Sequence, residues 1–376
     1  MVFFEVLEHK SFRMRVSTIF LVLLFSGHVL ADEPDTTSNA IVLSEYIFDA
    51  KDVSFPSCHA STIVETKEGL LVAWFAGTKE KDPDVGIWLS QYLHGEWSVP
   101  VEVANGVRGK AKQFPTWNPV LFNTGKEIKL FYKVGPSPRE WWGEVKTSVD
   151  NGLTWSLPLR LPKNIFGPIK NKPLKLADGK LLCPSSTENE GWRVHMEFYT
   201  DMDKTWERTD ALNDGNNISL IQPAILTHSD NAIQILCRSM NGAIFSSWSN
   251  DNGYTWSEFE TIGLPNPNSG FDAVTLKDGR HILVYNHIAC KTGEKWGDRN
   301  ILNIAISDDG KLWKAAELLE NDKDEDAEYS YPAVIQTNDG NVHITYTWNR
   351  TLIKHVVLDP LKINTKDIIN GIWPLE

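Results

Sequence analysis

The chain has 376 residues, of which 41% are hydrophobic, and its 49 acidic residues outnumber its 37 basic residues for a formal net charge of −12. A chain of this length can bury a large core. The acidic excess argues against nucleic acid or an anionic membrane surface as a partner, because both repel a negatively charged protein. Fifteen tryptophans are an unusually high number, and their positions prove informative.

The first segment has the pattern of an export signal. Arg13 and Arg15 precede an apolar run over residues 19–25, and residues 29–31 (Val-Leu-Ala) form a small-residue cleavage pattern. Because this run is too short to span a bilayer, it predicts a signal peptide over residues 1–31 rather than a membrane anchor. No later run is long enough for a span, so we expect an exported protein, secreted or periplasmic, without membrane insertion.

After this segment, an apolar strand, a polar turn and a second apolar strand recur six times. The copies begin, at intervals of 50 to 59 residues, near Ser61, Pro119, Pro173, Pro223, Ala273 and Pro332. This period, with several short strands in each repeat and no sustained helical pattern, is typical of a β-propeller. The sequence therefore predicts an all-β fold, a six-bladed β-propeller of four-stranded antiparallel blades, in a single domain over residues 32–376.

The last repeat lacks a fourth strand, because it ends at residues 353–358 and Pro360 follows. The apolar segment 41–48, before the first repeat, is spare. Pairing of these two segments would complete the last blade, close the ring and remove an exposed sheet edge.

A second repeated motif, with the pattern S-x-D-x-G-x-T-W, lies between the strand pairs. Residues 148–155 and 249–256 are complete copies, and shorter or degenerate copies end at Trp97, Trp206 and Trp313. Asp and Asn side chains bond their own backbone in turns, Gly accepts a positive φ, and a Trp ring can pack between neighbouring sheets. Each copy therefore predicts a structural hairpin turn.

These motifs resemble the Asp boxes of the BNR-repeat, sialidase-like family, and the resemblance extends over the chain from about residue 41. It implies a six-bladed propeller with a ligand funnel on the face opposite the Asp boxes. It also implies an exo-glycosidase that removes an acidic sugar from a glycan. The sequence has no H-x-x-x-H pair or carboxylate loop, so we expect neither a metal site nor a cofactor.

In such a propeller, the residue before each innermost strand and the end of the next strand face the same mouth. Side chains at equivalent places in every repeat then converge on one central funnel. The residues before the innermost strands are His59, Asn118, Lys172, Gln222, Asp272 and Tyr331. The ends of the next strands include Arg238 and Asn286, and His287 directly follows Asn286.

The resemblance implies that arginines bind the substrate carboxylate, since a guanidinium presents a fork of donors that matches it. Arg238 and Arg299 lie where the second and third family arginines are expected. The first belongs to an Arg-Ile-Pro motif in blade one, where this chain has His59 instead. We therefore expect His59, Arg238 and Arg299 to contact the substrate.

The resemblance also implies catalytic residues. Tyr331 occupies the position of the family nucleophile, but Leu220 stands where the carboxylate that activates it is expected. A nearby glutamate has to substitute for it, and the candidates are Glu188, Glu190, Glu197 and Glu328, of which we select Glu190. The general acid is expected in the loop over residues 77–84, as Asp84 or Asp82.

Two other functions remain open from the sequence alone. Imidazoles are numerous near the predicted funnel, with His59, His287 and His195, which alternates with Glu197 along a predicted strand. A histidine that abstracts a sugar-ring proton, with Tyr331 donating to the leaving oxygen, would make the protein a polysaccharide lyase acting on a uronic acid. A non-catalytic sugar-binding propeller is the third possibility. In all three the partner is an acidic glycan, and we expect a monomer.

Overall fold

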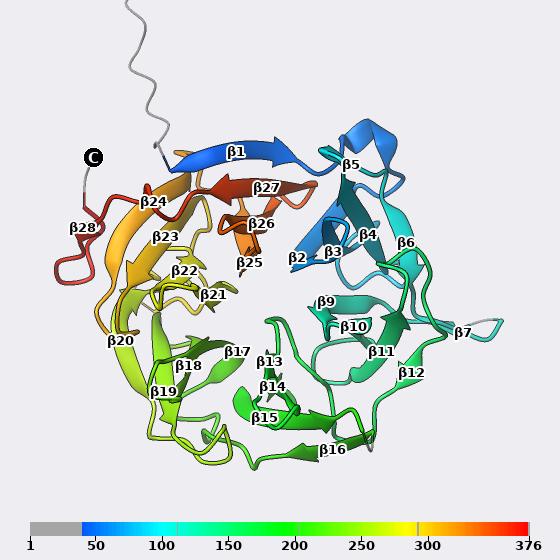
Figure 1. The fold of residues 1–376 in the computed structure, drawn as a ribbon, viewed down its shortest axis with the longest axis horizontal. Coiled ribbons are helices and arrows are strands. Elements are labelled where there is room, and N and C mark those ends of the chain that lie inside the picture. Colours follow the sequence, from blue (N-terminus) through cyan, green and yellow to red (C-terminus); the bar gives the residue numbers. More distant parts are fainter. Residues whose placement is uncertain (1–39, 111, 203, 292, 375–376) are drawn as a thin grey trace, which may run out of the picture. The chain divides into compact units, whose positions relative to one another are not determined.

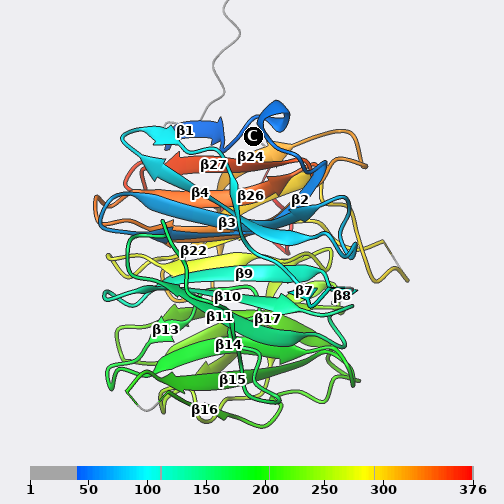
Figure 2. The ribbon, with the colours of Figure 1, turned by 90° about the vertical axis from the view of Figure 1, so that its right-hand side faces the viewer.

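The computed structural model describes residues 40–374 except residues 111, 203 and 292, so the expected signal peptide lies outside the described residues. The described residues belong to one compact unit. Six antiparallel sheets form a ring around a central axis (Figure 1). Viewed from its side, the ring has strands that run from one face toward the other (Figure 2). The predicted six-bladed β-propeller is confirmed. Within the described part of the chain, no helix has the length and apolar character needed to cross a membrane.

The strands follow the predicted repeat. Blade one contains β2 (Ser57–Glu65), β3 (Leu70–Gly77) and β4 (Gly86–Leu93), with an outer strand in two pieces, β5 (Glu96–Trp97) and β6 (Val101–Ala104). Blade two contains β9 (Thr116–Asn123), β10 (Ile128–Val134), β11 (Trp142–Ser148) and β12 (Leu159–Arg160). Blade three contains β13 (Leu174–Lys175), β14 (Leu181–Thr187), β15 (Arg193–Thr200) and β16 (Thr205–Arg208).

The second half of the ring repeats the plan. Blade four contains β17 (Leu220–Thr227), β18 (Ile233–Ser239), β19 (Ala243–Ser249) and β20 (Glu260–Pro265). Blade five contains β21 (Asp272–Thr275), β22 (His281–Tyr285), β23 (Ile301–Ser307) and β24 (Lys314–Asn321), with β28 (Lys366–Asp367) added outside. Blade six contains β25 (Tyr329–Gln336), β26 (Val342–Trp348), β27 (Leu352–Leu358) and β1 (Ile41–Tyr46). A short hairpin, β7 (Val107–Arg108) with β8 (Lys112–Gln113), and a 3-10 turn, η1 (Ala50–Asp52), complete the elements.

The ring is closed by β1, which comes from the opposite end of the chain and forms the outer strand of blade six. It pairs antiparallel with β27 from Ile41, opposite Leu358, to Tyr46, opposite Lys354. The pairing predicted for the spare strand is therefore confirmed. It satisfies backbone groups that would otherwise form an open sheet edge.

Apolar faces of neighbouring blades pack against each other and hold the ring together. One such core lies between blades five and six and includes Ile304, Ile344 and Val356, all fully buried. Strand side chains alternate between two faces, so a blade with neighbours on both sides needs apolar residues on both. This explains why the inner strands read as nearly continuous apolar runs.

The Asp box over residues 249–256 is a hydrogen-bonded turn. The Asp251 carboxylate accepts from the backbone N–H groups of Tyr254 (3.1 Å) and Thr255 (2.9 Å) and from the Thr255 hydroxyl (2.6 Å). The indole N–H of Trp256 donates to the carbonyl of Gly253 at 2.8 Å. The same indole bond occurs in the boxes that end at Trp155 and Trp313.

The register of blade two places the box at one end of the strands. Ser148, the first box residue, pairs with Ile128, whereas Trp142 pairs with Val134 at the other end of β10 and β11. The box and the loop over residues 135–141 therefore lie on opposite faces of the ring.

We expect Asp251→Ala to lower the free energy of unfolding by roughly 1–2 kcal/mol, because several turn donors lose their acceptor. Urea unfolding of the variant and the wild type measures the difference. Catalysis or sugar binding by the folded variant should be unchanged, since the turn lies on the face away from the cavity described below. A stable variant without sugar binding would contradict a purely structural role.

Candidate functional site

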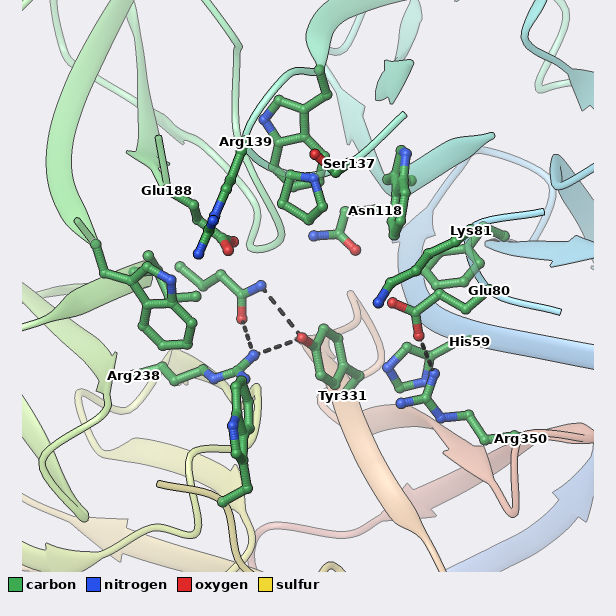
Figure 3. A pocket seen from close by; sticks show the side chains of 18 of the residues that line it. His59, Glu80, Lys81, Asn118, Ser137, Arg139, Glu188, Arg238, Tyr331 and Arg350 are labelled. Atoms are coloured by element: carbon green, nitrogen blue, oxygen red, sulfur yellow. Dashed lines mark hydrogen bonds and ion pairs between the residues drawn. The ribbon is translucent and has the colours of Figure 1, made fainter. Parts of the chain in front are cut away.

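A cavity of about 560 Å³ lies at the centre of the ring, on the face that carries the loop over residues 135–141 (Figure 3). Its charged side chains are five cations and two carboxylates, namely Lys81, Arg139, Arg238, Arg299, Arg350, Glu80 and Glu188. Its aromatic side chains are Phe75, Trp117, Trp141, Trp192, Trp296 and Tyr331. Cations in excess over carboxylates favour an anionic ligand, and aromatic faces suit the apolar faces of sugar rings.

A repeated backbone irregularity directs side chains into this cavity. In four blades the innermost strand has a β-bulge at the same place, and one residue there is left-handed: Ala60 (φ 59°), Asn118 (φ 34°), Gln222 (φ 54°) and Tyr331 (φ 52°). A bulge reorients a side chain, and a left-handed residue other than glycine or asparagine is uncommon. Three of the four line the cavity. Because the bulges of blades one and six correspond, Ala60 is the equivalent of Tyr331, and His59 lies one position before Ala60.

Arg238 is buried, with 3% of its surface exposed, and is enclosed by aromatic rings. Its guanidinium carbon lies 5.3 Å from the ring centre of Trp192, 5.4 Å from that of Trp296 and 5.6 Å from that of Tyr331. Its Nε donates to Asn268 at 2.8 Å. Cation–π contacts strengthen when desolvated, so this arrangement fixes a charged fork at the cavity wall.

The Tyr331 hydroxyl is the point on which neighbouring donors converge. Arg238 Nη1 donates to its oxygen at 2.6 Å, and Gln222 Nε2 lies 3.5 Å away, as the dashed lines in Figure 3 mark. The same Arg238 nitrogen donates to Gln222 Oε1 at 3.1 Å. A charge-assisted bond of this kind is stronger than a neutral one, so it fixes the position of the phenol oxygen. The Tyr331 ring rests on Gly270, where an added Cβ would lie 3.1 Å from it.

A second group of charges forms a chain that begins beside Arg238, because Arg299 Nη2 donates to the carbonyl of Asn268, whose side chain accepts from Arg238. Arg299 Nη1 lies 3.0 Å from Glu328 Oε1, and Arg350 Nε lies 2.8 Å from Glu328 Oε2. Arg350 Nη1 then reaches Glu80 Oε2 at 2.6 Å. Burial alone would raise the pKa of Glu328, but Arg350 and Arg299 lower it below the ordinary value. One ionised carboxylate thus holds two guanidiniums side by side.

His59 is a neutral imidazole within this positive site. Burial, reinforced by the charges of Arg350, Arg299 and Arg238, lowers the pKa of His59 well below its ordinary value. Its Nδ1 lies 2.9 Å from the Thr347 hydroxyl, and its ring centre lies 4.2 Å from that of Tyr331.

Glu188 is a cavity carboxyl group with a raised pKa. Burial raises the pKa of Glu188, and the opposing influences of Arg238, Trp192 and Arg139 only partly offset this. Figure 3 shows its side chain directed into the cavity. A carboxyl group that holds its proton to higher pH is suited to act as a general acid.

A family model described as "BNR repeat-like domain" matches residues 68–344, which is most of the propeller. The chain belongs to the BNR repeat-like family. The family resemblance predicted from the sequence is thereby confirmed. No curated protein matches the chain.

Solved structures similar to this BNR repeat-like chain share its fold at low sequence identity. A protein of unknown function from Dyadobacter fermentans has a TM-score of 0.65 and 15% identity, over 85% of this chain and 98% of that one. The Hadza microbial sialidase Hz136 has a TM-score of 0.72 and 15% identity, over 86% and 69%. The intramolecular trans-sialidase from Ruminococcus gnavus, solved with oseltamivir carboxylate, has a TM-score of 0.67 and 12% identity, over 88% and 100%.

The BNR repeat-like propeller brings six of the residues expected at the funnel into one cavity: His59, Asn118, Gln222, Arg238, Arg299 and Tyr331. Two further candidates, Lys172 and Asp272, pair with each other at 2.8 Å instead of lining it. The Asp272 carboxylate also accepts from the backbone of Val334, so these bonds connect blades three, five and six.

A buried lysine, Lys170, lies near Tyr331, with its Nζ 5.8 Å from the centre of the Tyr331 ring. Lys170 Nζ donates to Asn171 Oδ1 (2.8 Å) and to the carbonyls of Phe271 (2.9 Å) and Pro332 (2.7 Å). Burial lowers the pKa of Lys170 to about 7. Pro332 directly follows Tyr331, so Lys170 fixes the backbone that carries the phenol.

The structure places His287 away from the cavity. Its Nδ1 lies 2.5 Å from the Tyr285 hydroxyl and its Nε2 lies 2.8 Å from the Gly371 carbonyl, with Trp373 against the ring. It therefore attaches the C-terminal segment to blade five.

The carboxylates selected as catalytic from the sequence, Asp82, Asp84 and Glu190, also lie outside the cavity lining. Asp84 accepts from the backbone N–H (2.9 Å) and hydroxyl (2.7 Å) of Thr78, which closes the loop between β3 and β4. Asp82 is in the same loop and does not line the cavity, whereas Glu80 does. Glu190 is 73% exposed and contacts Arg193, whereas Glu188, two residues earlier, faces the cavity.

Sequence reasoning missed several residues of the cavity. The predictions do not include Glu80, Arg139, Arg350, Trp192 and Trp296, and all five lie in loops between strands whose sequences do not repeat from blade to blade. Within the described residues, no group of histidine, cysteine, aspartate and glutamate could hold a metal ion.

Proposed function

We propose that this protein is an exported carbohydrate-active enzyme, a sialidase-like exo-glycosidase that acts on an acidic sugar of a glycan. The observation that carries the proposal is the buried, aromatic-enclosed Arg238 next to Tyr331 in a cavity with more cations than carboxylates. Two of the similar structures are named a sialidase and a trans-sialidase, and the latter was solved with a carboxylate ligand.

In this proposal Arg238 and Arg299 bind the acidic group of the sugar, and Tyr331 is the nucleophile. Its oxygen bonds to the anomeric carbon as the bond to the leaving oxygen breaks, and its proton passes to the neutral His59 packed against it. Glu188 donates a proton to the leaving oxygen. Water then attacks the anomeric carbon and the bond from the sugar to the Tyr331 oxygen breaks, while Glu188 regains its proton from that water and Tyr331 regains its proton from His59.

A uronate lyase is the second candidate function, and the neutral His59 beside Tyr331 favours it. In that reaction His59 takes a proton from the carbon next to the carboxylate, and Tyr331 donates its proton to the leaving oxygen as a double bond forms. Both reactions use the same anionic sugar site, and a non-catalytic sugar-binding protein would use it without either reaction.

The experiment that separates these functions incubates the protein with a panel of sialosides and uronic-acid oligosaccharides. Released reducing sugar without ultraviolet absorbance supports the glycosidase, and absorbance of an unsaturated uronate supports the lyase. Binding without either product supports a sugar-binding protein. The absence of both binding and turnover across the acidic panel would contradict the proposal.

Export is tested separately. If the full-length chain is expressed with an intact secretion system, protein recovered outside the cytoplasm should begin at Asp32, as the cleavage pattern predicts. Recovery of protein that still carries residues 1–31 would contradict a cleaved signal.

A further inference from the structure

Arg350 binds two carboxylates that differ in how firmly they are held. It occupies the β26–β27 turn in a left-handed conformation (φ 58°), and its carbonyl accepts from the backbone of Cys58 in blade one at 2.8 Å. Its Nε faces Glu328, and its Nη1 faces Glu80. Its backbone is therefore fixed at the boundary of the first and last blades, and its side chain lines the cavity.

Glu328 is a permanent partner of Arg350. Its carboxylate also accepts from the Ser330 hydroxyl at 2.6 Å and pairs with Arg299, and its backbone N–H donates to Asn349 at 2.8 Å. Removing Glu328 from this position would leave two guanidiniums without their shared counter-ion, which is costly in a partly buried site.

Glu80 is a replaceable partner. It lies in the loop between β3 and β4, its side chain is one-third exposed, and within the described part of the chain its carboxylate bonds only to Arg350. Ion pairs with this much solvent access contribute little to stability. If Glu80 left, Arg350 would keep Glu328 as its counter-ion.

We propose that Glu80 occupies, in the free protein, the position that an anionic group of the substrate takes in the complex, and that Arg350 is a specificity-determining residue through this exchange. This inference rests on the proposed acidic-sugar function. The exchange leaves the charge of the cavity unchanged, because one carboxylate replaces another. A neutral sugar has no group that could replace Glu80, so it gains nothing from Arg350.

The test measures binding by calorimetry for sialyllactose and for a glucuronic-acid disaccharide, each beside its carboxyl-reduced analogue. Glu80→Gln removes the competing charge with little change of shape, and we expect it to tighten binding of the acidic probe about twofold to fivefold. Binding of the reduced analogue should not change. Glu140→Gln is the matched control, since Glu140 is an exposed carboxylate of the loop over residues 135–141 and does not line the cavity.

A double-mutant cycle assigns the effect to Arg350. In an Arg350→Gln background, binding of the acidic probe should be weaker, and Glu80→Gln should give no further gain. The exchange is contradicted by an unchanged affinity in Glu80→Gln, by an equal gain from Glu140→Gln, or by a gain that persists without Arg350. If Arg350→Gln does not fold, the comparison of Glu80→Gln with Glu140→Gln decides. Failure of the wild type to prefer either acidic probe would instead overturn the proposed function, and this inference with it.

Discussion

Arg238→Ala should remove the preference of the protein for acidic over neutral sugars. Arg238 is almost fully buried between two indole rings, and its charge has no solvent to screen it. Loss of one partner of a desolvated, hydrogen-bonded charge pair typically costs about 2–5 kcal/mol of binding free energy. We therefore expect the affinity for an acidic sugar to fall by roughly 30-fold or more.

Arg238→Lys should also weaken binding, because an ammonium group cannot reproduce the fork that contacts Asn268, Gln222 and Tyr331 together. Calorimetry with sialyllactose and its carboxyl-reduced analogue measures both variants, and thermal unfolding checks that they are folded. Arg280→Ala is the control, since Arg280 pairs with the half-exposed Asp278 outside the cavity. A folded Arg238→Ala protein that still prefers the acidic form would show that the anion binds elsewhere.

Glu188→Gln should lower turnover with little effect on binding. Loss of a general acid typically costs about 10²–10⁴-fold in rate. The loss should be large for sialyllactose, whose leaving group needs a proton, and smaller for a 4-methylumbelliferyl glycoside, whose leaving group does not. Steady-state kcat values for both substrates measure the difference. Glu190→Gln separates the two neighbouring carboxylates, and a larger loss in that variant would contradict the assignment to Glu188.

The pH dependence follows from the direction of the Glu188 shift. Burial raises its pKa, so the protonated, donating form persists to higher pH than for an ordinary glutamate. The rate should therefore fall as pH rises through the raised pKa, and this alkaline loss should be absent in Glu188→Gln. An identical pH profile in the variant would show that another group sets it.

The architecture was predictable because its signals repeat. The spacing of the strand starts and of the Asp boxes fixes the number of blades, and the missing strand of the last repeat leaves only one partner for residues 41–48. The funnel positions were predictable in blades two, four and six, where a proline follows the left-handed residue: Asn118, Gln222 and Tyr331. In blade one Ser61 stands where that proline would be, so the sequence does not mark Ala60 as the left-handed residue. The predicted funnel residue of blade one, His59, is therefore one position before the true equivalent of Tyr331.

The remaining site residues depend on contacts that a repeat does not encode. Lys172 and Asp272 occupy funnel positions, but each neutralises the other, and neither is left to face a ligand. Glu80 and Asp84 share one acidic loop, and only the bonds of Asp84 to Thr78 decide which of the two faces the cavity. Arg350 is four residues beyond Tyr346 on a hairpin turn, and nothing in its sequence context distinguishes it from a solvent-exposed arginine.

A crystal structure of the protein soaked with the acidic sugar that the panel selects would test the proposed site most directly. We expect the sugar in the cavity, with its carboxylate within hydrogen-bond distance of Arg238 and Arg299 and its ring beside Tyr331. A sugar bound outside this cavity, or one bound inside with its carboxylate directed away from both arginines, would contradict the proposed site.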